Sequence, residues 1–293
     1  MIKYIVTRIS TKHREQVLNK PVSESVQDRF TQSTSKFHFM NSATNNSLVK
    51  YCLRIADSSL VLGQRLGEWC GHGPILEEDI ALTNISLDLI GQARAFYTYA
   101  AQLENQGKTE DDFAFFRDER EYYNLLLTEQ PNGDFGQTIL RQFLISTYSY
   151  YFYSALKTSN DSTLSSLAEK SLKEVTYHLR HSSEWLIRLG DGTAESHQRV
   201  ENAIDELWRF TGDMFDMDEV DELLIKEGIA INLASLKEPW EKKVKEVFLK
   251  ATLKFPENQF MIQGSRNGKH TEHLGHLLTE MQALPRTFPG AEW

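Results

Sequence analysis

The chain has 293 residues, enough for one large domain with a substantial core or for two small ones. Charged residues make up 25% and hydrophobic residues 40%, as in soluble globular proteins, and no apolar run reaches the roughly 18 residues of a transmembrane helix. The 41 acidic residues outnumber the 32 basic ones, and the net charge of −9 disfavours general nucleic-acid binding. Cys52 and Cys70 form no CxxC pair, which argues against a disulfide scaffold, and we expect a cytoplasmic location.

The first part of the chain differs in composition from the rest. Residues 1–44 are polar and mixed in charge, and they contain no apolar stretch of the kind found in a secretory signal. We expect a disordered or weakly ordered extension here, with Met40 as a candidate for the native start. Residues 45–293 are expected to form a single helical domain.

Four long segments follow in which apolar residues recur at helical spacing. The pattern predicts helices over residues 47–69, 76–104, 135–156 and 162–189, separated by segments rich in Gly, Pro and Asn. Helices of this length span about 30–40 Å, since each residue adds about 1.5 Å. The sequence therefore predicts an all-α protein built on an antiparallel four-helix bundle.

Shorter helices are predicted around this bundle. One covers residues 113–127, between the second and third long helices. Three more, over residues 197–215, 240–252 and 270–284, are expected to pack outside the bundle or against a partner.

A long four-helix bundle can hold a carboxylate-bridged metal pair. Such a site needs a Glu from each of two helices and a Glu-x-x-His from each of the other two. On the second long helix the central stripe positions three apart are Leu89 and Gln92, and on the fourth they are Val175 and His178. Neither pair is a Glu-x-x-His, and Gln is a poor ligand for a hard cation. The inward faces therefore disfavour metal binding.

The same two helices carry a matching polar pattern. Residues 88–94 and 174–180 both begin with an acid, continue with an apolar residue, have a polar residue at the fifth position and end in Arg. We interpret these positions as a structural polar cluster whose acids pair with a neighbouring Arg or Lys. Its members are Asp88, Gln92, Arg94, Glu174, His178 and Arg180. A buried cluster of this kind must satisfy its own hydrogen bonds and can fix helix register.

Two motifs near the C-terminus have alternative interpretations. His270, His273 and His276 are spaced by three, so they share one face of a helix, and a zinc site is chemically possible. A polar stripe at an interface is the preferred interpretation. Residues 264–271 resemble a phosphate loop but are one residue short of GxxxxGK[ST] and follow no predicted strand. We therefore expect an ordinary loop that leads into the last helix.

Eight segments, in one order from about residue 47 to the end, resemble the C-subunit family of phenylacetyl-CoA epoxidases. They are Leu60–Pro74, Asn84–Arg94, Arg117–Arg120, Glu129–Gly133, Lys173–Arg180, Leu207–Thr211, His270–Gly275 and Pro289–Trp293. The resemblance implies a ferritin-like fold and a non-catalytic partner of the A subunit, which carries the di-iron site and binds the CoA thioester. That complex inserts one oxygen atom from O2 into the aromatic ring in aerobic bacterial phenylacetate breakdown. Its electrons come from NADPH through a flavin and iron–sulfur reductase subunit.

The resemblance also aligns the metal-ligand positions of the catalytic subunit with residues of this chain. Asp-Glu-Ala-Gly-His there corresponds to residues 88–92, and Glu-Glu-x-x-His corresponds to residues 174–178, so Leu89 and Val175 replace Glu and Gln92 replaces His. The carboxylate of the third long helix is replaced by Ser146, and the first offers none between residues 58 and 65. The aligned set retains His178 alone, so we expect no cofactor in this chain.

The predicted function is a catalytically silent subunit that stabilises and positions the oxygenase subunit. The aromatic run of residues 148–153 is too large to bury on one bundle face, so part of it is expected at the partner interface. The candidate interface residues are Tyr151, Tyr153, His270, His273 and His276. Two alternatives remain: an oxygenase in its own right, with two irons or two manganese ions held by unusual ligands, and a zinc protein built on the three histidines.

Overall fold

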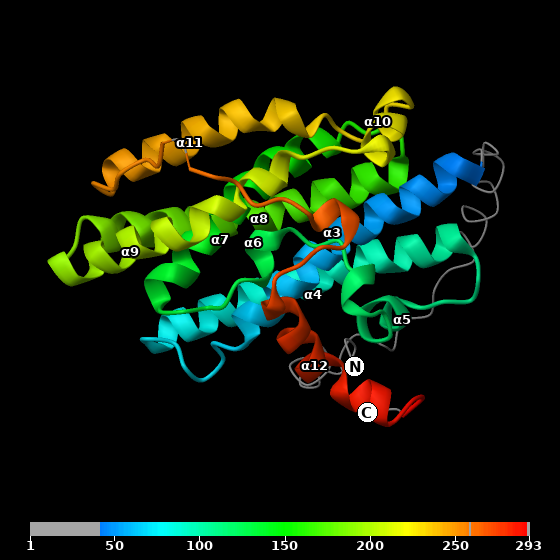
Figure 1. Cartoon of the computed structure of the whole chain (residues 1–293), viewed down its shortest axis with the longest axis horizontal. Coiled ribbons are helices and arrows are strands. Elements are labelled where there is room, and N and C mark those ends of the chain that lie inside the picture. The colour runs from blue at the N-terminus through cyan, green and yellow to red at the C-terminus, as the bar shows by residue number, and fades with distance from the viewer. Residues whose placement is uncertain (1–41, 258, 292–293) are drawn as a thin grey trace, which may run out of the picture.

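The structure is a computed structural model that describes residues 42–257 and 259–291. Its largest elements are four long helices that lie side by side (Figure 1), α3 (Ser42–Gly67), α4 (Leu76–Glu104), α7 (Phe135–Leu156) and α8 (Ser162–Gly190). Short connections make α3 antiparallel to α4 and α7 antiparallel to α8, and the long segment 105–134 crosses from one pair to the other. The described residues contain no β-strand. The predicted all-α four-helix bundle is therefore confirmed.

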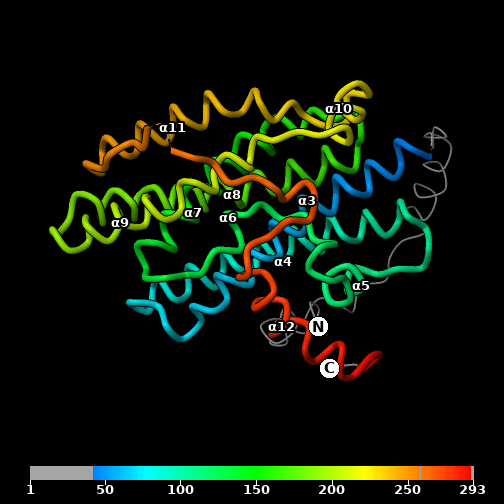
Figure 2. Tube along the Cα trace, viewed as in Figure 1, coloured from blue at the N-terminus to red at the C-terminus, as the bar shows by residue number. Residues whose placement is uncertain are grey.

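Shorter helices cover the bundle. The crossover contains α5 (Glu110–Phe115), the 3-10 turn Glu119–Glu121 and α6 (Leu126–Glu129). After α8 the α-helices are α9 (Ala194–Leu207), α10 (Glu219–Lys226), α11 (Lys237–Lys250) and α12 (Glu272–Thr287). Further 3-10 turns cover Trp208–Phe210, Gly212–Phe215, Leu233–Leu236 and Ser265–Asn267. After α11 the chain runs back along the bundle before it enters α12 (Figure 2).

Side-chain caps fix where several helices begin. Asp134 accepts a hydrogen bond from the Gln137 backbone N–H at the start of α7, and Asp161 does the same for Leu164 in α8. Thr109, before α5, forms a reciprocal capping box. Each cap satisfies a backbone donor that the first turn of a helix leaves free.

The α3 and α4 helices approach each other closely at a glycine. The Ser86 hydroxyl donates to the Gly63 carbonyl at 2.6 Å. A Cβ atom at Gly63 would lie 3.1 Å from Ile90 Cγ1 and 3.2 Å from the Ser86 carbonyl oxygen, which is tighter than ordinary van der Waals contact. The small residue therefore allows these two helices to pack with little separation.

One continuous apolar core joins the bundle to its cover. Trp240 of α11 is buried, and its indole N–H donates to the Leu144 carbonyl of α7 at 3.0 Å. Trp208 packs against the Trp240 ring with centroids 5.6 Å apart. The C-terminal helices are thus part of the same folding unit as the bundle.

Several predicted boundaries differ from the structure. Residues 42–44 belong to α3 rather than to an N-terminal extension, and the remainder of that predicted extension lies outside the described residues. Residues 113–127 are not one helix, because the chain is extended at 122–125, where its backbone bonds to side chains of α3. The predicted helix over 197–215 ends at Leu207, and helix α10 was not predicted.

Candidate functional site

The five positions that the resemblance aligns with metal ligands all lie inside the bundle. They are Leu89 and Gln92 on α4, Ser146 on α7, and Val175 and His178 on α8. None of the five exposes more than 6% of its surface. The sequence therefore placed these residues correctly in the core.

Gln92 joins three helices at this centre. Its amide nitrogen donates to the Glu174 carboxylate of α8 at 2.9 Å, and its amide oxygen accepts from the Tyr153 hydroxyl of α7 at 3.2 Å. Glu174 is half-buried, and that burial, together with the nearby charge of Asp88, raises its pKa above the usual value. A neutral amide thus occupies a position where a metal site would place an imidazole.

The helices α4 and α8 are also linked by two acid–imidazole pairs. His178 Nε2 lies 3.0 Å from a carboxylate oxygen of Asp88, and His181 Nε2 lies 2.8 Å from one of Glu78. Asp88 thus has the ion-pair or hydrogen-bond role expected of it, but its partner is an imidazole of α8 rather than a neighbouring Arg or Lys.

The two arginines of the predicted polar cluster lie outside it. Arg94 bonds to Glu110 at 3.1 Å, and the Arg180 guanidinium lies 5.7 Å from the centre of the Tyr177 ring. Arg180 is exposed and Arg94 is partly exposed, so both charges keep contact with solvent. The cluster is therefore made of Asp88, Gln92, Glu174 and His178, with Tyr153 as an additional member.

The donor set at the centre does not fit two iron ions. Carboxylates at the bridging positions are replaced by Leu89 and Val175, and the Ser146 hydroxyl accepts a hydrogen bond from Gln142 at 2.9 Å. Across residues 42–257 and 259–291, no group of three or more His, Cys, Asp or Glu side chains is arranged to hold a metal ion. The aligned positions retain an imidazole, an amide and a hydroxyl, which cannot supply the negative charge that a carboxylate-bridged pair requires. The adjacent carboxylates of Glu174 and Asp88 bond to Gln92 and His178 instead.

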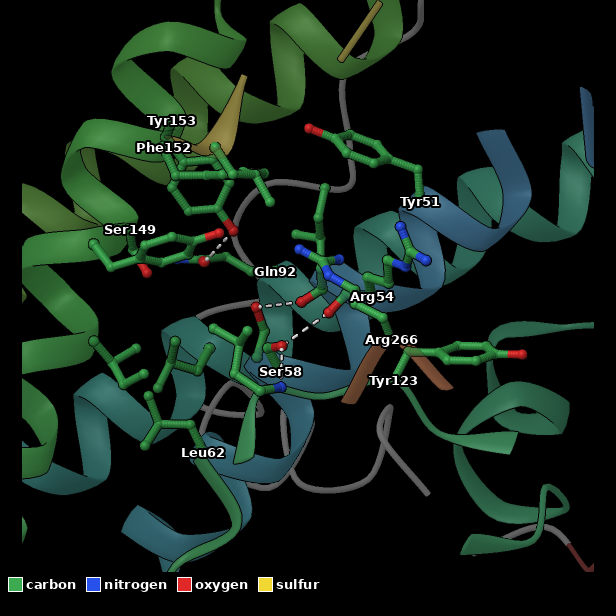
Figure 3. Close-up of a pocket in the computed structure, with 17 residues that line it drawn as sticks. Tyr51, Arg54, Ser58, Leu62, Gln92, Tyr123, Ser149, Phe152, Tyr153 and Arg266 are labelled. Atoms are coloured by element: carbon green, nitrogen blue, oxygen red, sulfur yellow. Dashed lines mark hydrogen bonds between the residues drawn. The ribbon is translucent and has the colours of Figure 1, made fainter. Parts of the chain in front are cut away.

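A cavity of about 60 Å³ lies beside these positions, between α3, α4 and α7. Leu62, Leu89, Ile145 and Phe152 give it a largely apolar wall. Figure 3 shows Tyr51, Arg54 and Arg266 on one side of this space, with Ser149, Phe152 and Tyr153 on the other. The bundle interior is therefore not completely filled beside the aligned positions.

Buried charges lie instead at the crossover segment, where the sequence had not indicated them. Asp57 of α3 is fully buried and accepts hydrogen bonds from the Tyr97 hydroxyl at 2.5 Å, the Tyr123 backbone N–H at 2.8 Å and the Arg117 guanidinium. Burial alone would lower the pKa of Arg117, but the charge and hydrogen bond of Asp57, together with the nearby Tyr97 and Tyr122, outweigh burial and raise that pKa. This ion pair ties the crossover to the bundle.

A second buried pair ties the crossover to the C-terminal segment. Glu129 accepts from Asn124 and from both the backbone N–H and the hydroxyl of Thr271, at 2.6–2.8 Å. His270 Nδ1 lies 2.8 Å from Glu129, and its Nε2 lies 2.8 Å from the Tyr122 carbonyl. Since a carbonyl and a carboxylate both accept, the ring donates from both nitrogens and is positively charged.

The pKa of His270 agrees with this geometry. Burial alone would lower that pKa, but the hydrogen bond and negative charge of Glu129 outweigh burial and raise it above its usual value. The side chains of both residues are fully buried. The interpretation of His270 as a surface interface residue is therefore wrong.

The three C-terminal histidines do not form a common site. His270 precedes α12, whereas His273 and His276 lie within it, and His276 is exposed. The structure therefore gives no support to the zinc alternative. A role for His273 and His276 at an interface stays a prediction.

The aromatic run on α7 is more deeply buried than expected. Tyr148, Phe152 and Tyr153 are all within the core, so the interpretation of Tyr153 as an interface residue is wrong. Tyr150 and Tyr151 are half-buried, and their rings meet edge to face at 5.4 Å. Tyr151 remains a candidate interface residue.

Residues 264–271, which resemble a phosphate loop, bind a carboxylate of this same chain. Asp213 is fully buried and accepts from the backbone N–H groups of Gly264 and Ser265 at 3.1 and 3.3 Å. It also accepts from the Leu126 N–H at 3.2 Å. The loop is thus a structural connection, as the sequence indicated.

The described helices include none that is long and apolar enough to cross a membrane. Comparison with known proteins agrees with the resemblance. The family of phenylacetic acid catabolic proteins matches residues 31–293. The C subunit of 1,2-phenylacetyl-CoA epoxidase from Escherichia coli (strain K12) is 51% identical over 248 residues, which cover 85% of this chain and 100% of that protein. This chain belongs to the family of phenylacetic acid catabolic proteins.

Proposed function

We propose that this chain is the non-catalytic C subunit of a phenylacetyl-CoA epoxidase. Its task is to stabilise and position the A subunit, which carries the di-iron centre and the thioester substrate. The observation that carries this proposal is the replacement of bridging carboxylates by Leu89 and Val175 inside an otherwise well-packed bundle. The helices keep their packing while the chemistry of a metal site is missing.

The remaining parts of the proposed complex lie in other subunits. The A subunit supplies the iron-dependent insertion of oxygen, and a reductase with flavin and iron–sulfur groups supplies electrons from NADPH. We place the complex in the bacterial cytoplasm, where CoA thioesters and NADPH are available. In this arrangement the present chain contributes surface and rigidity but binds no cofactor.

Metal analysis of the isolated chain tests the silent role. The chain is purified alone from iron-supplemented cells, and its iron is measured beside that of a co-purified complex with the A subunit. We expect iron in the complex and close to none in the isolated chain. About two irons per isolated chain would contradict the proposal and favour an oxygenase with atypical ligands.

The partner interface is tested separately at Tyr151. A permanent interface of this kind buries more than about 2,000 Å², and aromatic side chains often contribute most of its energy. Tyr151→Ala should weaken co-purification with the A subunit, whereas Tyr151→Phe, which keeps the ring, should not. Unchanged co-purification of the Ala variant would exclude this side chain from the interface.

A further inference from the structure

A surface groove lies between the bundle and helix α11. Helix α11 runs along α7 and α8 (Figure 1) and contacts both of them. The groove has a volume of about 550 Å³, and Leu179 and Ile187 of α8 and Val247 of α11 give it apolar walls. Tyr151, the candidate interface residue of α7, lines the same groove beside Tyr150. The groove is therefore continuous with the surface on which we expect the partner.

The charged side chains around this groove are not balanced. The cations are Arg180, Lys243 and Lys250, and the carboxylates are Glu184 and Glu246. Both lysines bind the same carboxylate, since oxygens of Glu246 lie 3.2 Å from Lys243 Nζ and 2.8 Å from Lys250 Nζ. These hydrogen bonds lower the pKa of Glu246, so it stays ionised and is shared by two cations. The groove therefore has an excess of positive charge.

Helix α11 as a whole is basic in an acidic protein. It contains five lysines and three glutamates, whereas the net charge of the whole chain is −9. Leu249 follows Glu246 by three residues, so it lies on the same side of the helix, and it is 81% exposed. Apolar walls with charged residues around them are the arrangement of protein interfaces, in which a polar rim surrounds an apolar centre.

We propose that this groove receives an acidic segment of the A subunit, a stretch in which carboxylate side chains stand beside apolar ones. The apolar side chains pack on Leu179, Ile187 and Tyr151. The carboxylates accept hydrogen bonds from Lys243 and Lys250, which then no longer share one acid. This inference rests on the function proposed above, because it assigns that partner to one surface of this chain. Opposite charges on the two surfaces also attract before contact and speed association.

Association kinetics with the purified A subunit test this groove in the full chain. The variant reverses both lysine charges, Lys243→Glu with Lys250→Glu. Because charges at the rim of an interface act mainly on the association rate, we expect the association rate constant at low salt to fall at least about tenfold. The remaining rate should also depend less on salt concentration, since fewer opposite charges are left for salt to screen.

The same helix offers a matched control. Lys237 and Lys245 of α11 line a different groove, so Lys237→Glu with Lys245→Glu changes the net charge equally without touching the proposed site. Its effect on the association rate should be much smaller. A third variant, Lys243→Gln with Lys250→Gln, places no new acid beside Glu246 and should give an intermediate rate. Circular dichroism of each variant confirms that the helices are intact.

Two results would overturn the proposal. Equal rates for the two charge-reversed variants would mean that overall charge matters and this groove does not. Faster association after reversal of Lys243 and Lys250 would mean that the partner surface is basic. The metal analysis separates this inference from the proposed function. Iron close to zero in the isolated chain, together with either result, removes the groove and leaves the silent role, whereas a wild-type chain that fails to bind the A subunit removes both.

Discussion

The bundle centre and the crossover segment both contain buried polar groups, but they use them differently. At the centre, Gln92 is neutral, and its partner Glu174 is half-buried. At the crossover, Asp57 and Arg117 form an ion pair, and the carboxylate of Asp57 accepts hydrogen bonds from three different residues. The aligned positions at the centre thus hold no carboxylate, whereas a buried ion pair joins the crossover to α3.

The difference shows what each region must do. The bundle centre is held by apolar packing, and a few hydrogen bonds to Gln92 and His178 are enough to satisfy its polar atoms. The crossover contributes buried apolar side chains such as Phe113 and Leu126, but its extended stretch 122–125 bonds to side chains of α3. Geometrically specific ion pairs fix such a segment, and their partners cannot be removed singly without cost.

The largest expected effect comes from removing the charge of Asp57. Asp57→Asn leaves the Arg117 guanidinium buried beside a neutral amide, which should lower the free energy of unfolding by about 3 kcal/mol. Urea denaturation followed by circular dichroism measures this loss. A change below about 1 kcal/mol would mean that the crossover does not depend on the ion pair.

A smaller, pH-dependent effect is expected at His270. Its folded-state pKa is raised above the usual value of about 6.5, so its stabilising contribution is complete below that pH. The contribution is lost as the pH rises through the raised pKa, because the neutral ring can donate only one of its two hydrogen bonds. The wild-type chain should therefore lose its advantage over His270→Gln between about pH 6.5 and alkaline pH.

Thermal unfolding at a series of pH values measures this difference. The His270→Gln variant is the reference for the wild-type chain at each pH, since Gln is polar and does not titrate. If the stability difference between the two proteins is the same at all pH values, His270 is not charged in the folded state.

The smallest effect is expected at the bundle centre. Glu174→Gln keeps the shape of the side chain and removes a half-buried charge, so the free energy of unfolding should change by less than about 1 kcal/mol. The measurement is the same urea denaturation as for Asp57→Asn, to which it is the matched control. A loss as large as that of Asp57→Asn would remove the distinction between the two regions.

The long helices could be predicted from the sequence because their apolar spacing is regular. The predicted boundaries of α4 and α7 agree with the structure, and that of α8 differs by one residue. Helix α10 was missed although Asp218 and Asp221 form a capping box at its start, a signal that the sequence does contain. Its eight residues are too few for periodicity to stand out.

The site could be predicted only in part. The spacing along α4 and α8 identified Gln92 and His178 as inward positions, because one helix sets that geometry. The partners of these residues depend on how two helices are rotated against each other, which no local pattern records. Asp57 was missed for the same reason, since its partners lie at least 40 residues away along the chain.

Asp213 links the C-terminal segment to the crossover, because its carboxylate accepts hydrogen bonds from Gly264, Ser265 and Leu126. This carboxylate and that of Glu129 receive donors from residues 264, 265 and 271, far beyond them in sequence. A chain truncated before residue 264 would leave both acids buried without those donors. Residues 264–271 thus complete the buried hydrogen bonds of the crossover, which can reach its final form only after these residues have been synthesised.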